Sequence, residues 1–219
     1  MVEKYIEELK PYVKELFKDD SSGHDIGHLI RTMNTALYIQ EKEGGDRVII
    51  GIAAFLHDFH RIMHGEHKGT IHPRESIPMV REILDKINLT EEQKDKICFC
   101  IEYHEEYNWN GNNVDDLNTL ILQDADNLDA IGAIGIARTF AFTGSHKLSL
   151  YDETIPLNEE SDFKEESGYD PSTIHHFYHK LFKLGDNMNT ETAKQLAKNR
   201  TDYMKNYVKE FLDEWNANY

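Results

Sequence analysis

The chain has few of the features that mark secreted or membrane-bound proteins. It holds only two cysteines, Cys98 and Cys100, and their spacing would turn them to opposite sides of a helix. We expect them to be small apolar fillers in a reducing compartment, sharing neither a disulfide nor a metal. No apolar run is long enough to span a bilayer, and residues 1–8 show no basic stretch followed by a signal-peptide core. These absences predict a cytoplasmic protein without a membrane partner.

Basic residues are also scarce. Lys and Arg number 24 against 40 Asp and Glu, which gives a formal net charge of −16. Proteins that bind nucleic acid need a basic surface, so this balance argues against DNA or RNA as a partner. A small anionic substrate is still compatible with it, because a buried metal cation would set the local field whatever the surface charge.

What the chain does contain is helical periodicity. Apolar residues recur at helical spacing through most of the sequence, and no segment alternates convincingly with period two. The sequence therefore predicts an all-α fold, with helices over residues 2–18, 25–42, 47–56, 73–87, 90–104, 115–129, 133–142, 172–184 and 190–217.

Capping signals mark three of the predicted helix starts. Asp46 can cap the helix that ends at Leu56, and Thr90 opens a Thr-x-x-Gln capping box. Asp170 is interpreted as an N-cap, because a proline follows it at the first helical position. We expect the segments 61–70 and 144–170 to be irregular.

The pair His57-Asp58 follows the apolar run of residues 49–56. A helix this apolar should be buried, and an isolated buried carboxylate is costly unless it is paired or binds a metal. The pair therefore predicts a buried cation, whose other ligands must come from elsewhere in the chain.

A second apolar segment supplies further carboxylates. Residues 120–131 contain Asp124, Asp126 and Asp129 among leucine, isoleucine and alanine, where a solvated helix face would not place them. A lone histidine is weak evidence, because the chain has 12. The order of a histidine, the His-Asp pair, two more histidines and an aspartate is more informative, and it predicts a metal site.

Several segments together resemble the HD-domain metal-dependent phosphohydrolase superfamily. They are His24-Asp25-x-x-His28-x-x-Arg31, Ala53-Ala54-Phe55-Leu56-His57-Asp58, and the run from Asp124 to Phe140, which is similar to the DADxLDAxGAxGIAR stretch of a bacterial HD hydrolase subfamily. The tail from Ile174 to Ala193 is also similar to that subfamily, so the resemblance extends over nearly the whole chain.

The resemblance implies an HD-domain helical bundle with additional C-terminal helices. It favours a single domain over residues 1–219, with the metal-site core at about 20–142, an irregular loop over 144–170 and C-terminal helices over about 171–217.

The resemblance also implies that His28, His57, Asp58 and Asp126 bind a divalent metal ion. Asp126 is chosen over Asp124 because the family ligand is the aspartate directly before an x-Leu step, and Asp124 would then orient a ligand. Imidazole and carboxylate ligands suit Mn, Fe, Co, Ni or Zn, and two or more carboxylates also permit Mg.

Two further histidines bear on a second ion. Some branches of the superfamily resemble the order H…HD…H…H…D and bind two metals bridged by the aspartate of the HD pair. His72 and His104 fall in that order, so we predict a second metal with these two as ligands. The subfamily with the closest aspartate run is usually read as single-metal. In that alternative His72 would cap a helix and His104 would be an exposed helix-end residue.

The reaction that we expect is hydrolysis of a phosphate ester or phosphoanhydride by metal-bound hydroxide. The family resemblance suggests a nucleotide as the small phosphorylated substrate. Asp58 as a ligand, Arg31 as a phosphate-binding cation and Asp124 as an orienting residue or proton donor are the predicted catalytic residues.

Cations near the pocket should hold the substrate phosphate. Arg31 is the first choice, since it lies one helical turn after His28. Arg61 and Lys68 follow the His-Asp pair and come next, and His24 is assigned a hydrogen-bonding or substrate role.

Two other functions stay open. A few HD-domain proteins with the two extra histidines use mixed-valence iron to activate oxygen, so a di-iron oxygenase is one alternative. A non-catalytic nucleotide-binding or regulatory module is the other, although a pure binder would not need an open metal position.

Overall fold

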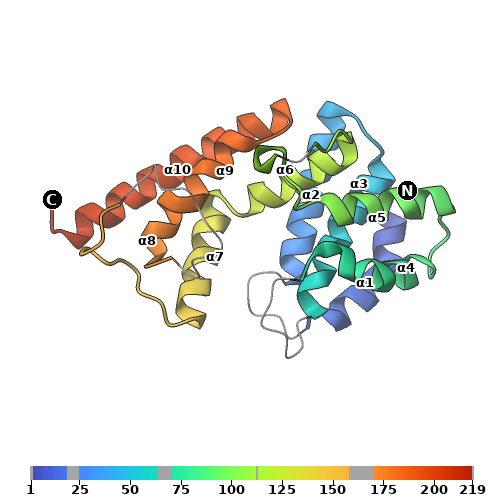
Figure 1. Cartoon of the computed structure of the whole chain (residues 1–219), viewed down its shortest axis with the longest axis horizontal. Helices are drawn as coiled ribbons and strands as arrows, with labels where there is room; N and C mark the ends of the chain where they lie inside the picture. The colour runs from blue at the N-terminus through green and yellow to red at the C-terminus, as the bar shows by residue number, and fades with distance from the viewer. Residues whose placement is uncertain (1, 19–24, 64–70, 112, 158–169, 219) are drawn as a thin grey trace. The chain divides into compact units, whose positions relative to one another are not determined.

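The computed structural model describes residues 2–18, 25–63, 71–111, 113–157 and 170–218. Within these ranges the chain is built almost entirely from helices, and the sole β pairing recorded is an isolated bridge between Ser149 and Ser172 (Figure 1). The predicted all-α fold is therefore confirmed. No helix in the described ranges combines the length and the apolar content that a membrane span requires.

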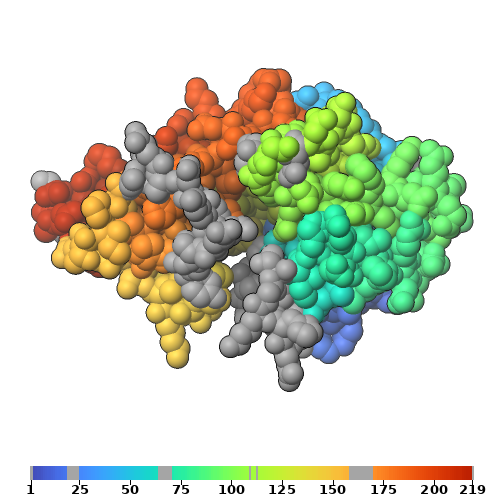
Figure 2. All heavy atoms as spheres, in the orientation of Figure 1, coloured from blue at the N-terminus to red at the C-terminus, as the bar shows by residue number. Residues whose placement is uncertain are grey.

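The helices form two compact units, Met1–Asp126 and Asn127–Tyr219, which are described separately. In Figures 1 and 2 the first unit runs from blue to yellow-green and the second from yellow-green to red. The helices of the first unit are α1 (Val2–Leu16), α2 (Ile26–Glu43), α3 (Arg47–Leu56), η1 (His57–Met63), η2 (Pro73–Ser76), α4 (Ile77–Leu84), α5 (Glu91–Tyr103), η3 (Asn108–Asn110) and most of α6 (Leu117–Asp129).

Helix α3 is the centre of the first unit. Every residue from Ile49 to Leu56 is buried, and the helix packs against α1, α2 and α5. A helix that is apolar on all sides has to be surrounded, because each exposed face would leave apolar area in water. The chain that leaves α3 therefore begins inside the core, and this places His57 and Asp58 there.

Two helix caps of the first unit match the predicted signals. The Asp46 carboxylate accepts hydrogen bonds from the amides of Val48 and Ile49, and Thr90 forms a reciprocal capping box with Gln93. Helix α2 begins after Asp25, whose side chain accepts from the amide of His28. The start of α2 thus fixes the backbone of a predicted site residue.

The second unit contains the end of α6, then α7 (Gly132–Ser145), α8 (Thr173–His176), the π-helical turn η5 (Phe177–Leu181), α9 (Phe182–Leu184), η6 (Gly185–Asn187) and α10 (Glu191–Trp215). Helix α10 packs along α7, α9 and η6. The predicted helix over 172–184 is present but interrupted by the π turn.

The aspartate- and glycine-rich run from Asp124 to Phe140 includes the junction between α6 and α7. Asp129 accepts from Arg138 at 2.8 Å, so this aspartate has a structural partner. Gly132 adopts a φ of +78°, and a Cβ there would lie 2.9 Å from the Arg200 side chain. Arg200 itself donates to the carbonyl of Leu128. One ion pair, one hydrogen bond to a backbone carbonyl and a glycine therefore hold the junction.

Asp170 is not the N-cap that the sequence predicts. Helix α8 begins at Thr173, and the Ser172 hydroxyl accepts from the His175 amide at 3.4 Å. The Asp170 carboxylate instead accepts from Nδ1 of His176 at 2.5 Å and from Nδ1 of His179 at 2.7 Å. Asp170 and Ser172 are both possible caps, two residues apart. Ser172 caps the helix, because the Asp170 carboxylate is bound by His176 and His179, one and two turns into the helix.

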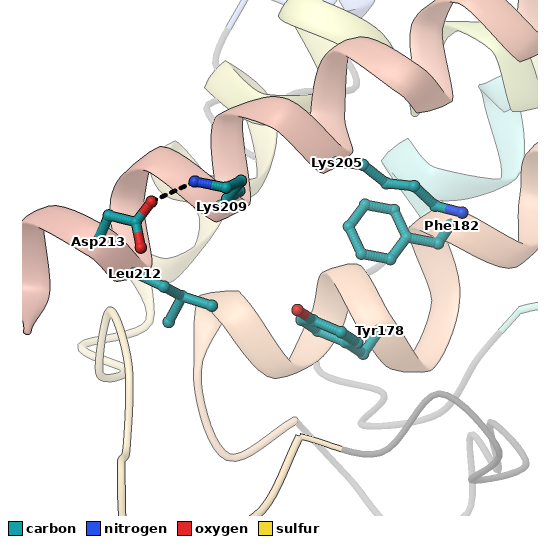
Figure 3. Close-up of a pocket in the computed structure, with 6 residues that line it drawn as sticks. All are labelled: Tyr178, Phe182, Lys205, Lys209, Leu212 and Asp213. Carbon is teal, nitrogen blue, oxygen red and sulfur yellow. Dashed lines mark hydrogen bonds and ion pairs between the residues drawn. The ribbon is translucent and has the colours of Figure 1, made fainter. Parts of the chain in front are cut away.

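Figure 3 shows a shallow groove in the second unit, between α10 and the segment that holds η5 and α9. Lys205 lies over the Phe182 ring at 5.6 Å, Tyr178 meets the same ring edge-on at 5.2 Å, and Lys209 pairs with Asp213. These side chains satisfy one another, and the groove contains no histidine. It is not a candidate for the predicted metal site.

Candidate metal centre

Four side chains from three segments converge inside the first unit. His28 lies in the first turn of α2, His57 and Asp58 lie where α3 passes into η1, and Asp126 lies near the end of α6. His28, His57 and Asp58 are fully buried, and the Asp126 side chain is 17% exposed. At Asp58 the backbone departs from helical geometry (φ −89°, ψ 17°), so consecutive residues both reach the cluster.

The donor atoms of these side chains lie close together. Nε2 of His28 lies 3.2 Å from Nε2 of His57, 3.2 Å from Oδ2 of Asp58 and 3.3 Å from Oδ1 of Asp126. Nε2 of His57 lies 3.6 Å from each of the same two carboxylate oxygens. A tetrahedral ion with bonds of 2.0–2.2 Å would have edges of about 3.3–3.6 Å. The separations of His28 and His57 from each other and from the two carboxylates therefore match those of neighbouring ligands around one divalent ion.

The protonation of the histidines also fits. Nδ1 of His57 lies 2.8 Å from the carbonyl of Ala54, and Nδ1 of His104 lies 2.6 Å from the carbonyl of Ile101. A carbonyl only accepts, so each Nδ1 carries the proton and each neutral ring keeps its Nε2 lone pair for a metal. Among the described residues Nε2 of His104 has no hydrogen-bond partner, although it is buried. A cation would satisfy it.

The electrostatics of the cluster favour positive charge. Burial alone would lower the pKa of His57, but the carboxylates of Asp58 and Asp126 raise it above its usual value. Burial would likewise raise the pKa of Asp126, yet the adjacent side chains of His28 and His57 hold it well below its usual value. An anionic Asp126 beside neutral imidazoles is the charge state that a divalent ion would bind, and the ion would take the place of the proton that the carboxylates favour on His57.

The second oxygen of Asp58 points away from His28 and His57. Oδ1 accepts from Nε of Arg61 at 2.6 Å, and Nη2 of Arg61 donates to Glu105 at 2.9 Å. Burial would lower the pKa of Arg61, but Asp58 and Glu105 raise it. The guanidinium predicted to bind substrate is thus already shared between two carboxylates, and it holds Asp58 in one orientation.

His104 and His60 extend the cluster on the Asp58 side. His104 is the C-cap of α5 and is fully buried, so the exposed helix-end alternative is wrong. Burial lowers its pKa to about 4, which keeps the ring neutral at pH 7. Two sets of donors, His57–His104–Asp126 and Asp58–His60–His104, have atoms within 4.8 Å of one another, as has His28–His57–Asp58.

His72 is not in any of these sets. Its Nδ1 accepts from the amide of Arg74 at 3.1 Å and caps η2, while its Nε2 donates to Glu106 at 3.0 Å. Both ring nitrogens are therefore engaged by the protein. His72 therefore caps a helix, as the single-metal alternative expects, and we do not include His72 among the ligands proposed below.

The remaining predicted residues have different placements. Arg31 is partly buried on α2, three residues after His28, and Asp124 is fully buried on α6. His24 and Lys68, both assigned to substrate, lie outside the described residues.

Three residues near the cluster were not predicted from the sequence to bind metal or substrate: His60, Glu105 and Tyr107. Burial would raise the pKa of Glu105, but His60, His104 and Arg61 lower it to about 2. Burial, followed by Asp126 and Glu105, raises the pKa of Tyr107 well above its usual value, so the phenol keeps its proton. The available signal was proximity in sequence: His60 follows His57 by three residues, and Glu105 follows His104.

Comparisons with known proteins identify the family. The HD domain family model matches residues 25–131, which include all four converging residues. An HD-superfamily hydrolase from Bacillus thuringiensis is 35% identical, with a TM-score of 0.75, and the match covers 99% of this chain and 100% of that chain. The chain belongs to the HD superfamily.

A curated relative is YpgQ of Bacillus subtilis (strain 168). It is 34% identical over 210 residues, which cover 94% of this chain and 92% of YpgQ. A crystal structure of YpgQ in complex with ADP has a TM-score of 0.71 and 34% identity, and covers 95% of this chain and 96% of that chain. The predicted HD membership is confirmed, and HD domains bind divalent metals, as the His/Asp cluster here could.

Proposed function

We propose that this protein is a metal-dependent phosphohydrolase that acts on a phosphate ester or phosphoanhydride of a nucleotide. The observation that carries the proposal is that His28 and His57 lie at ligand spacing from each other and from both Asp58 and Asp126. The HD-superfamily hydrolases that share the full length of the chain support a hydrolytic reaction. The ADP complex of YpgQ supports a nucleotide as the substrate class.

A bound divalent cation would act as a Lewis acid and lower the pKa of a water molecule. The protein would hold that ion through His28, His57, Asp58 and Asp126. Hydrogen bonds from His57 to Ala54 and from Arg61 to Asp58 fix the rotation of two of these ligands. Such fixed partners matter because a ligand that rotates freely pays conformational entropy each time it binds.

Arg31 is the residue that we propose for the substrate phosphate. It is half-buried on the same helix as His28 and one turn after it, so the two side chains start from the same face of α2. An arginine can bind phosphate through two parallel hydrogen bonds. His24 and Lys68 keep the substrate roles that the sequence predicts. We assign Arg61 to holding Asp58 instead, because both sides of its guanidinium meet carboxylates.

The test is a hydrolysis screen on protein stripped with EDTA. Nucleoside mono-, di- and triphosphates are supplied with Mn, Mg, Co or Ni, and phosphate and pyrophosphate release are measured. We expect release that requires metal and that falls at least about 100-fold in Asp126→Asn. Asp129→Asn is the matched control, because Asp129 belongs to the same aspartate run but pairs with Arg138.

Two outcomes would redirect the assignment. Tight nucleotide binding without turnover in any metal would indicate a regulatory module. Iron in the purified protein together with oxygen uptake would indicate the oxygenase.

A further inference from the structure

We infer that Gln123 is a positioning residue of the metal centre, which acts on Asp58 through the turn that follows α5. The inference rests on the proposed function, since it concerns how one of the proposed ligands is held. Gln123 lies on α6, three residues before Asp126, so the two side chains share one face of that helix. It is fully buried, and a buried amide group has to find hydrogen-bond partners.

Two partners of Gln123 lie in that turn. Its Nε2 donates to the carbonyl of Tyr103 at 3.1 Å and to the carbonyl of Glu106 at 3.2 Å. The Glu106 amide also donates to the Tyr103 carbonyl at 3.1 Å, so the two carbonyls belong to one tight turn. The last carbonyls of a helix need partners from outside it, and the C-cap of α5 is His104 rather than a glycine. The Gln123 amide therefore fixes the end of α5 from a neighbouring helix.

The same turn carries Glu105, between the two carbonyls that Gln123 binds. Oε1 of Glu105 accepts from Nη2 of Arg61 at 2.9 Å, and Nε of the same guanidinium donates to Oδ1 of Asp58 at 2.6 Å. The other oxygen, Oδ2 of Asp58, lies 3.2 Å from Nε2 of His28. Hydrogen bonds and one short piece of backbone thus lead from Gln123 to a proposed ligand. A shift of Glu105 would move Arg61 and free Asp58 to rotate.

Burial makes this arrangement costly to break. Gln123 and Asp58 are fully buried, and the side chains of Arg61 and Glu105 are only 30% and 29% exposed. Water compensates incompletely for a hydrogen bond that is lost in such surroundings. The turn and Arg61 therefore keep one arrangement while Gln123 is in place, and Asp58 presents the same oxygen to the other ligands.

The experiment is a Mn²⁺ titration of the EDTA-treated protein, with free Mn²⁺ measured by electron paramagnetic resonance. Glu105→Ala removes an acceptor of Arg61 and should weaken Mn²⁺ binding at least about tenfold. Gln123→Met keeps a buried side chain of similar length without an N–H, and should weaken Mn²⁺ binding about three- to tenfold. Gln123→Asn, whose amide is one methylene too short to reach both carbonyls, should act in the same direction and serves if the methionine variant does not fold.

A double variant separates positioning from a merely structural role. If Gln123 acts through Glu105, the protein with both Gln123→Met and Glu105→Ala should bind Mn²⁺ as Glu105→Ala alone does, within about twofold. Gln93→Met is the matched control, because Gln93 also holds one end of α5, in the capping box with Thr90. This control should lower the urea midpoint of unfolding and leave the Mn²⁺ affinity of the wild type unchanged.

Unchanged Mn²⁺ affinity in folded Gln123→Met would overturn the inference. Unchanged affinity in Glu105→Ala would also overturn it, whether or not the Gln123 variants fold, as would effects that multiply in the double variant. A failure of the proposed function looks different. A wild type that binds Mn²⁺ and loses affinity in these variants, but hydrolyses no phosphate compound, would refute the proposed reaction and still support the positioning role. A wild type that binds no Mn²⁺ would refute both.

Discussion

Three histidines of the cluster are each oriented by the backbone carbonyl one helical turn earlier. Nδ1 of His57, His60 and His104 lies beside the carbonyl three residues earlier in each case. The contact is local, so it forms wherever the chain turns helically at these positions, and it fixes which nitrogen carries the proton. Three rings thereby present the same atom, Nε2, to one region of the first unit.

Asp170 gives a prediction about stability and pH. Burial would raise its pKa, but hydrogen bonds from His176 and His179 lower it below the usual value. A carboxyl group with a lowered pKa in the folded state binds fewer protons there than in the unfolded state. Its contribution is therefore complete above about pH 4 and is lost as the pH falls further. We expect Asp170→Asn to lower the free energy of unfolding by about 1–3 kcal/mol at pH 6.

Urea unfolding of both proteins between pH 3 and pH 6 measures this effect. The difference between wild type and variant should shrink as the pH falls below about 4. Asp202→Asn is the control, because Asp202 is exposed on α10 and a surface change of this kind stays within about 0.5 kcal/mol. A difference that does not depend on pH would contradict the assigned role of the carboxylate.

Cys100 gives a prediction about reactivity. The thiol is 1% exposed, and burial raises its pKa to about 12. The thiolate is the reactive form, so the native protein should show no alkylation of Cys100 by iodoacetamide at pH 8, while the urea-unfolded protein is modified at both cysteines. Mass spectrometry of the tryptic peptides reads out the adduct. Equal rates of alkylation at Cys100 in the folded and the unfolded protein would contradict the burial of this thiol on α5.

At the scale of elements, the junction of α6 and α7 depends on Gly132. Its φ of +78° is a conformation that costs other residues roughly 1–2 kcal/mol, and a Cβ there would lie 2.9 Å from Arg200. We expect Gly132→Ala to lower the free energy of unfolding by at least about 1 kcal/mol, measured by urea denaturation.

Gly144 provides the control for that substitution. It lies in the last turn of α7, and a Cβ there would meet nothing within 4 Å. Gly144→Ala should therefore be neutral or stabilise by up to about 1 kcal/mol, because alanine has the better helix propensity. If the two substitutions have the same effect, the positive φ of Gly132 is not what holds the junction.

Helix boundaries were predictable where the local sequence singled out one cap. Asp46 is the one such side chain at the start of its helix, and Thr90 is favoured over Asn88 because Gln93 completes its capping box. Asp170 and Ser172 are both possible caps, and the choice depends on His176 and His179, which lie further along the helix. Local pattern cannot decide between two caps when a longer-range contact recruits one of them.

At the scale of the whole molecule, the all-α fold followed from periodicity and from the apolar α3, because a helix without a polar face has to be surrounded. The placement of the histidines did not follow in the same way. Chain order favours His72 as the ligand beside His104, whereas the structure brings His60 there instead, because of the path of η1 and η2. Glu105 belongs to the cluster for the same reason, since the end of α5 fixes it near Arg61 and His60.

The most direct test of the metal centre is the metal content of the purified protein, measured by inductively coupled plasma mass spectrometry on wild type, Asp126→Asn and Asp129→Asn. We expect at least one Mn, Fe, Co, Ni or Zn ion per chain in wild type and in Asp129→Asn, whose side chain pairs with Arg138 instead. Asp126→Asn should lose most of that metal while staying folded by circular dichroism. A folded Asp126→Asn protein with the full metal content of the wild type would contradict the ligand set of His28, His57, Asp58 and Asp126.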